Sequence, residues 1–432
     1  MSQKNIQGIE FADDRKTLKK FPRDYQGDYV IPDGVTTIGE SAFSGCEGLT
    51  HIVFPDSVEV IKNYAFASCK GLTEITLPDK VTCLGRRALY ACENLQHIHL
   101  PDNLKILGMY ALRYCRSLKE IELPESLEKI GYCAMEGCEG LTRLHIPAGV
   151  KEMCDSIVVR CPNLVSLTVS KDNPVFDSRD HCNGIVHTES DTLVQTCKTT
   201  FIPKSVTAIG SRAFCANDEI TEIHLHDGIT EIGQRAFCAC PQLKKVRIPD
   251  SVSKIEEAAF FYSPVLQEIY IPKGVTTINE FTFANCSSLE KVYIPDGVTA
   301  IREFAFSDCS SVSEIRLPQS LTYIGDSTFW GCKELKNVDI PDRVSCIGEE
   351  AFKECTSLTH VRLPESLKEI DCGTFEKCTA LKEILIPDNV TCIGPSAFRE
   401  CTALETVYLP STQIEINDSA FCGCTANIKK SI

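Results

Sequence analysis

Histidine and glutamate side chains recur in the first third of the chain at an interval that can bring them together. Divalent transition metals bind imidazole nitrogens and carboxylate oxygens, so His97, His99, Glu122 and His145 are candidate metal ligands. The alternative is a polar face on which histidine and glutamate alternate, so that like charges avoid vertical contact, and this alternative is the interpretation we prefer. At intervals of 23 residues the set comprises His51, Glu74, His97 and Glu120, beside His99, Glu122 and His145.

A second set at the same interval is rich in tyrosine and arginine. Both residue types are frequent in binding hot spots, because each combines a large contact area with directed polar groups. The alternative is that both simply suit exposed strands, with arginine stacked on tyrosine. We expect this set to form the centre of a partner-binding surface. Its members are Arg247, Tyr270, Tyr293, Arg316 and Arg362.

Motifs of the common catalytic and nucleotide-binding sites are missing from the sequence. It contains no P-loop, no G-x-G-x-x-G, no H-E-x-x-H and no G-x-S-x-G. We therefore predict that the protein is not an enzyme and that it needs no cofactor.

The interval belongs to a repeat that runs through nearly the whole chain. Pro32, Pro55 and Pro78 are 23 residues apart, and the spacing continues to Pro410 with one break after residue 170. Within each repeat an aliphatic residue, a phenylalanine and a cysteine follow the proline at fixed distances, as Ile38, Phe43 and Cys46 do after Pro32. One such unit is too short to bury its apolar residues, so successive units must stack and share a core.

Each repeat predicts a short parallel strand, a second extended piece and a turn. In LTEITL (72–77), Leu72, Ile75 and Leu77 are expected to point inward and Glu74 and Thr76 outward. A glycine often follows the second piece, as at Gly39 and Gly108, and is expected to provide a positive φ. A short helical turn, AFxxC, is expected to close the coil.

These residues resemble the BspA-like leucine-rich repeats, whose pattern is IPxxVxxIGxxAFxxCxxLxxI. The resemblance covers about residues 29–427. It implies an α/β repeat solenoid, a curved leucine-rich-repeat array with a parallel β-sheet on its concave face, short extended pieces and short helical turns elsewhere. It also implies a binder of other macromolecules without catalytic residues, often at a cell surface.

The resemblance and the break in the interval divide one continuous solenoid into four parts. Residues 1–30 are expected to form a hairpin-like cap, because Gly8-Ile9 and Thr17-Leu18 match Gly184-Ile185 and Thr192-Leu193 of the insertion. Residues 31–170 form the first block of repeats and 171–202 a hairpin-type insertion. Residues 203–432 form the second block, which ends in a truncated coil.

Charge and cysteine content restrict the partners and the compartment. The net charge of −15 argues against nucleic acid, which attracts basic surfaces, and no apolar run is long enough to insert into a membrane. The 25 cysteines fall mostly in the inward column, where cysteine acts as a small buried hydrophobe. Many unpaired thiols and the lack of a secretory segment at the start predict a cytoplasmic protein, and the resemblance suggests the cell surface instead.

The function predicted from the sequence is therefore a non-enzymatic scaffold that recognises a protein or glycan on its concave face. The first alternative is end-to-end self-association. This alternative is considered because Asn427 stands where the repeat has leucine, which marks the last coil as truncated. The open ends of a solenoid can stack on one another. The second alternative, a metal-binding protein that uses the histidine and glutamate patch, is less favoured.

Overall fold

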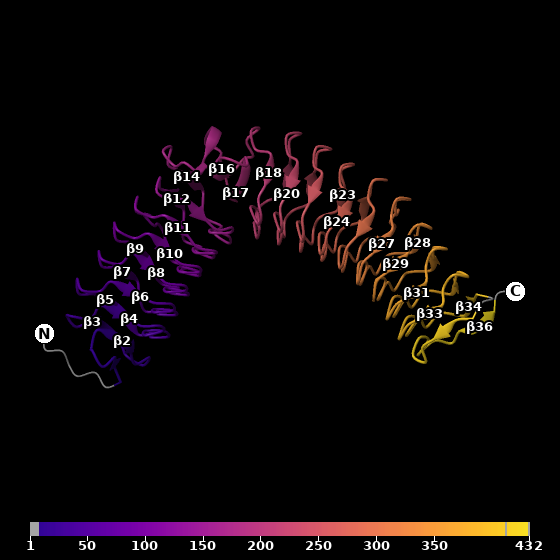
Figure 1. Ribbon diagram of the computed structural model, residues 1–432, viewed down its shortest axis with the longest axis horizontal. Helices are drawn as coiled ribbons and strands as arrows, with labels where there is room; N and C mark the ends of the chain where they lie inside the picture. Colours follow the sequence, from indigo (N-terminus) through magenta and orange to yellow (C-terminus); the bar gives the residue numbers. More distant parts are fainter. Residues whose placement is uncertain (1–7, 411–412, 431–432) are drawn as a thin grey trace. The chain divides into compact units, whose positions relative to one another are not determined.

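The computed structural model describes residues 8–410 and 413–430. Residues 1–7 of the expected cap, and 411–412 and 431–432 of the expected second block, lie outside the described residues. The chain divides into two compact units, Met1–Val206 with Arg212–Cys215, and Thr207–Ser211 with Ala216–Ile432. Within each unit the backbone winds in successive coils of similar shape (Figure 1), and we call one 23-residue turn of this solenoid a coil.

The first row of strands forms one long side of each unit, which we call the strand face. Neighbouring strands pair in parallel one coil apart, as Glu74↔His97 and Thr76↔His99 do. Leu72, Ile75 and Leu77 are buried and Glu74 and Thr76 exposed, as predicted. In unit 1 the row comprises β3 (Gly27–Val30), β5 (Leu49–Val53), β7 (Glu74–Thr76), β9 (His97–His99), β12 (Arg143–Ile146) and β14 (Ser166–Val169). In unit 2 it comprises β19 (Glu222–His224), β21 (Lys245–Arg247), β23 (Glu268–Tyr270), β25 (Lys291–Tyr293), β28 (Asn337–Asp339), β30 (His360–Arg362), β32 (Glu383–Leu385), β34 (Thr406–Leu409) and β36 (Asn427–Lys430).

A second row of two-residue strands follows the proline turn in each coil. Its strands also pair in parallel, as Ile106↔Cys83 and Leu107↔Leu84 do. In unit 1 the row comprises β4 (Thr37–Ile38), β6 (Val60–Ile61), β8 (Cys83–Leu84), β10 (Ile106–Leu107), β11 (Lys129–Ile130) and β13 (Glu152–Met153). In unit 2 it comprises β18 (Ala208–Ile209), β20 (Glu231–Ile232), β22 (Lys254–Ile255), β24 (Thr277–Ile278), β26 (Ala300–Ile301), β27 (Tyr323–Ile324), β29 (Cys346–Ile347), β31 (Glu369–Ile370), β33 (Cys392–Ile393) and β35 (Glu415–Ile416).

Antiparallel strands occur at the N-terminal side and in the segment that interrupts the repeat. β1 (Glu10–Phe11) pairs with β2 (Thr17–Lys20). In the interrupting segment, β16 (Gly184–His187) pairs with both β15 (Phe176–Asp177) and β17 (Thr192–Thr196). A 3-10 helix, η1 (Arg179–His181), connects β15 to β16.

The AFxxC segments form the opposite side of each coil, which we call the turn edge. The expected helical turn is wrong here: the segment is a series of hydrogen-bonded turns, and η1 is the single helix in the described residues. Two residues in nearly every segment have left-handed backbone, as Ser41 (φ 56°) and Gly45 (φ 77°) do. This conformation turns alternate N–H groups toward the next coil, so that the N–H of Phe43 donates to the carbonyl of Ala65 at 2.7 Å.

The glycine after the second strand has a different role from the one expected. Gly39, Gly108 and Gly131 do not have positive φ. A Cβ on Gly108 would lie 2.5 Å from the carbonyl oxygen of Leu84 and 2.8 Å from the carbonyl carbon of Gly85. The glycine therefore permits the backbones of two successive coils to approach closely, and the positive φ falls two and six residues later.

The core of unit 2 is a stack of aromatic rings beside a column of thiols, whereas in unit 1 the ring column passes after Phe66 to Leu89 and other aliphatic residues. The rings of Phe260 and Phe283 are nearly parallel, with centroids 5.5 Å apart and an interplanar angle of 5°, and both side chains are fully buried. Most thiols of this column donate to a carbonyl of the preceding coil, as Cys92 does to Phe66 at 3.1 Å. Burial raises the pKa of Cys92 to about 12, so this thiol is neutral, and the column cysteines are unbridged, as predicted.

We expect Gly108→Ala to lower the free energy of unfolding by about 1–3 kcal/mol, because the added methyl group overlaps the backbone of the preceding coil. Gly297→Ala is the matched control, since its Cβ would have a single neighbour within 4 Å, the carbonyl oxygen of Lys273 at 3.3 Å. That control should change stability by less than about 1 kcal/mol. Equal effects of the two substitutions in urea unfolding would contradict the close-approach role.

Stability should fall at alkaline pH because of the thiol column. The thiol of Cys92 has a pKa near 8.5 when unfolded and about 12 when folded. Its contribution is therefore fully present below the unfolded pKa and decreases as the pH rises toward the folded pKa, by about 1.4 kcal/mol per pH unit. Cys92→Ser should reduce this slope by that amount, and Ser263 shows that serine fits this column, with its hydroxyl donating to the carbonyl of Phe237. An unchanged slope in urea titrations across this pH range would refute the assignment.

Candidate partner-binding surfaces

Two stacked tyrosines form an aromatic platform on the strand face of unit 2. Tyr270 on β23 and Tyr293 on β25 are register partners in a parallel ladder. Their rings are nearly parallel, with centroids 4.1 Å apart and an interplanar angle of 6°. The two residues are 52% and 44% exposed, so the stack presents a flat apolar surface with two hydroxyl groups.

Arginines occupy the same position in the coils before and after this stack. Arg247 and Arg316 are exposed, and neither makes an ion pair with a carboxylate in the part of the chain that the structure describes. Their guanidinium groups therefore keep their hydrogen-bond donors for another molecule. Arg247, Tyr270, Tyr293 and Arg316 thus occupy four successive coils of one column.

The structure separates Arg362 from this group. Asp339 occupies the intervening coil, and Arg362 donates two hydrogen bonds to the carboxylate of Asp342, at 2.7 and 2.8 Å. A third bond goes to the carbonyl of Ile340 at 3.0 Å. The sequence interval placed Arg362 in the right column, but its own neighbours already bind its guanidinium group.

The histidine and glutamate patch lies on the strand face of unit 1. Glu120 binds Arg143 at 2.6 Å, and His145 is hydrogen-bonded to the hydroxyl of Thr168 at 2.9 Å. Glu120, Glu122, Arg143 and His145 line an open depression of about 380 Å³. Among residues 8–410 and 413–430, no three histidine, cysteine, aspartate or glutamate side chains are placed to hold a metal ion, the candidates His97, His99, Glu122 and His145 included.

The interrupting segment borders a second depression, of about 490 Å³. Arg179 lies in its wall between two carboxylates, 2.8 Å from Asp177 and 2.5 Å from Asp191. The pair with Asp191 joins η1 to the hairpin that follows it, the pair with Asp177 joins η1 to β15, and together they neutralise Arg179 within the segment.

A cluster of tyrosines and arginines on the turn edge of unit 1 escaped the sequence analysis. The guanidinium group of Arg87 lies 4.9 Å from the centroid of the Tyr110 ring and 5.5 Å from that of Tyr64. The rings of Tyr110 and Tyr132 meet edge to face at 5.5 Å. We call this cluster the tyrosine–arginine patch, and it comprises Tyr64, Arg87, Tyr110, Arg113, Tyr132 and Arg212.

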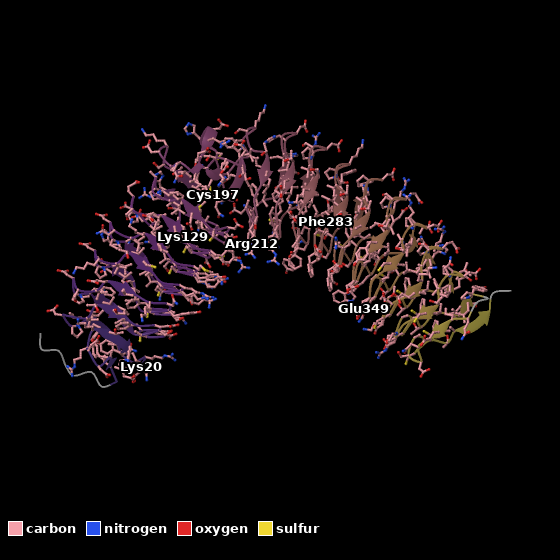
Figure 2. The ribbon with its side chains drawn as sticks, viewed as in Figure 1. Lys20, Lys129, Cys197, Arg212, Phe283 and Glu349 are labelled. Atoms are coloured by element: carbon pink, nitrogen blue, oxygen red, sulfur yellow. The ribbon has the colours of Figure 1, made fainter. Side chains whose placement is uncertain are left out.

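The arginines at the two ends of the patch differ in whether a carboxylate neutralises their positive charge. Arg113 lies over Tyr110 and Tyr114 and binds the buried carboxylate of Glu136 at 2.9 Å. Burial alone would lower the pKa of Arg113, but the hydrogen bond and charge of Glu136 raise it. Arg212 instead donates to the Tyr132 hydroxyl and lies 5.4 Å from the centre of that ring; Figure 2 labels it at the turn edge.

A sequence signal for this patch existed. Tyr64, Arg87, Tyr110 and Arg212 each stand nine residues after the proline of their coil. These positions lie in the turn, outside the outward columns of the strands in which the sequence predicted binding residues.

Comparisons with known proteins place this architecture in a family. The model of the BspA type leucine rich repeat region matches in six copies, over residues 36–165, 194–313 and 299–428. The chain belongs to the BspA-type leucine-rich-repeat family. A search of the curated proteins gave no match.

Solved structures share the BspA-type fold over most of the chain. A leucine-rich repeat protein from Bacteroides ovatus is 23% identical, with a TM-score of 0.51, and the match covers 98% of each chain. One from Eubacterium ventriosum is 20% identical, with a TM-score of 0.54, over 89% of this chain and 90% of that one. A leucine rich cell surface protein from Faecalibacterium prausnitzii is 25% identical, with a TM-score of 0.53, over 82% and 92%.

The BspA-type repeat accounts for the scaffold and leaves the surface columns to the individual protein. The aliphatic, phenylalanine and cysteine positions of the repeat are mostly buried, whereas the exposed columns differ from coil to coil within this chain. In the described residues no helix has the length and apolar character needed to cross a membrane.

We expect Glu136→Gln to lower the free energy of unfolding by about 2–3 kcal/mol, because it leaves the half-buried Arg113 without its counter-charge. The double variant Arg113→Gln/Glu136→Gln should be closer to the wild type than the single variant is, since it removes both charges. A double variant that is less stable than Glu136→Gln in chemical denaturation would show that the ion pair is not what connects these two coils.

Proposed function

We propose that this protein is a non-enzymatic scaffold that binds a protein or glycan partner through its strand face, centred on Tyr270 and Tyr293. The observation that supports this proposal most directly is the exposed tyrosine stack. Large apolar side chains on a surface cost free energy in water. A pair held face to face, about half exposed, is the kind of platform that a binding partner covers.

The flanking arginines complete the proposed binding surface. Arg247 and Arg316 supply planar guanidinium groups, each with several donors suited to carboxylates and carbonyls. The platform is held on paired strands rather than on a loop, so little conformational entropy is lost on binding. This combination of rigid aromatic rings with adjacent arginines is typical of the centres of protein interfaces.

Membership of the family supports the scaffold part of the proposal and does not identify the partner. The similar protein from Faecalibacterium prausnitzii is described as a cell surface protein, and cell-surface and cytoplasmic locations for this chain both stay predictions. The proposal needs only an accessible strand face, so it applies in either compartment. End-to-end self-association likewise stays a prediction.

The experiment compares three proteins on a printed glycan array and on an array of displayed peptides. Tyr270→Ala/Tyr293→Ala should lose at least about tenfold in affinity, about 1.4 kcal/mol, for whichever probe the wild type binds. Leu385→Ala is the matched control, since Leu385 is 60% exposed in the same column and lies outside the platform.

The result expected is loss in the double variant and retention in the control. Thermal unfolding of all three proteins verifies that the platform substitutions leave the solenoid folded. A wild-type ligand that binds Tyr270→Ala/Tyr293→Ala with unchanged affinity would overturn the assignment of the site.

A further inference from the structure

The tyrosine–arginine patch carries positive charge that the protein itself does not neutralise. In the described residues Arg87 and Arg212 make no ion pair with a carboxylate, and the exposed Arg86 lies 6.0 Å from the Tyr110 ring without one. Arg113 is compensated by Glu136. With Arg86 counted beside the three arginines of the patch, three of four guanidinium groups are therefore available to an anion.

The donors of the patch are held in place before any ligand arrives. Arg87 is half-buried among three tyrosine rings. Its Nη1 donates to the Tyr64 hydroxyl at 2.9 Å, while its buried Nε has no hydrogen-bond partner among the described residues. Burial raises the pKa of Tyr132 to about 12, so this hydroxyl stays protonated at neutral pH. Because cation–π contacts restrict the arginines, little entropy is lost when an anion binds them.

The turn edge of unit 2 has the opposite character. The position eight residues after the proline is acidic in five successive coils there, and Figure 2 labels one member, Glu349. The neighbouring carboxylates Glu349 and Asp326, after burial and Glu369, help to raise the pKa of Asp371, as expected for crowded negative charge. A polyanion is repelled from this edge and attracted to the patch. The five residues are Glu257, Glu280, Glu303, Asp326 and Glu349.

The spacing of the patch favours one class of polyanion. Its free guanidinium groups lie at two places along the turn edge: Arg86 and Arg87 belong to one coil, and Arg212 lies beyond the coils of Tyr110 and Tyr132. A ligand that contacts both places must be long, carry anionic groups at intervals and pack against the tyrosine rings between them. A linear acidic polysaccharide does this, because its sugar rings have flat apolar faces and its anionic groups recur along the chain, whereas the side chains of an extended acidic peptide present no flat face to the rings.

We propose that the tyrosine–arginine patch binds a linear acidic polysaccharide through its sulfate or carboxylate groups. Arg86, Arg87 and Arg212 bind the oxyanions, and the hydroxyl of Tyr132 donates a further hydrogen bond. The site is on the turn edge of unit 1, whereas the proposed strand-face site is on unit 2, and neither proposal depends on the other.

The test measures binding of heparin, a sulfated polysaccharide, and of hyaluronate, whose anionic groups are carboxylates, to the full chain at low and high salt. Arg87→Gln/Arg212→Gln should weaken binding of the preferred polysaccharide at least about tenfold at low salt. The dependence of affinity on salt should also become shallower, because fewer counterions are released. If the wild type binds hyaluronate, the recognised group is a carboxylate. If it binds heparin alone, the recognised group is a sulfate.

Three further proteins make the result decisive. Arg247→Gln/Arg316→Gln removes the same charge from the strand face and should leave polysaccharide affinity within about twofold. Tyr270→Ala/Tyr293→Ala should do the same, which separates this site from the strand-face site. Arg86→Gln changes only an exposed side chain, so it should fold even if Arg87→Gln/Arg212→Gln does not. It should weaken polysaccharide binding severalfold.

Several outcomes would overturn the proposal. They are a wild type that binds neither polysaccharide, an equal loss in the patch and strand-face arginine variants, and unchanged affinity in Arg86→Gln. Binding of poly-glutamate or duplex DNA as tightly as polysaccharide would also overturn it, because charge alone would then explain the binding.

Discussion

The contact of each coil with the next one is the constraint on which the rest of this structure depends. A single coil buries little, and its phenylalanine becomes fully buried only between two others, as Phe283 is between Phe260 and Phe306. Hydrogen bonds cross the same boundary in the strands, at the turn edge and from the thiols. These contacts use buried side chains and backbone groups. The exposed side chains can therefore differ from coil to coil without changing the stack.

Much of the fold could be predicted because the repeat interval records burial directly. The inward positions of Leu72 and Ile75 and the buried thiol at Cys92 follow from their columns. The role of Gly108 could not be predicted. Glycine suits a positive φ and a close backbone approach equally well, and only the position of the preceding coil shows which applies. The helix expected at AFxxC failed because left-handed residues such as Ser41 interrupt it.

The candidate sites were predictable only where the strand register fixes the neighbours. Tyr270 and Tyr293 meet because parallel pairing places equivalent residues side by side. Arg362 shares their column, yet a residue outside the column, Asp342, binds it, and no interval in the sequence contains that information. The tyrosine–arginine patch depends on Arg87 and Arg212 reaching across coils, which requires the conformation of the turn to be known.

The backbone hydrogen bonds that join one coil to the next at the turn edge run in one direction. The N–H groups of Ser41, Phe43 and Gly45 donate to carbonyls of the following coil, and those of Tyr64, Phe66 and Ser68 do the same one coil later. The peptide dipoles along this edge are therefore aligned, as they are in an α-helix, but the axis runs along the stack rather than along the chain. Each unit thus has a built-in electrical polarity at this edge, with partial positive charge toward its last coil, and every added coil extends it.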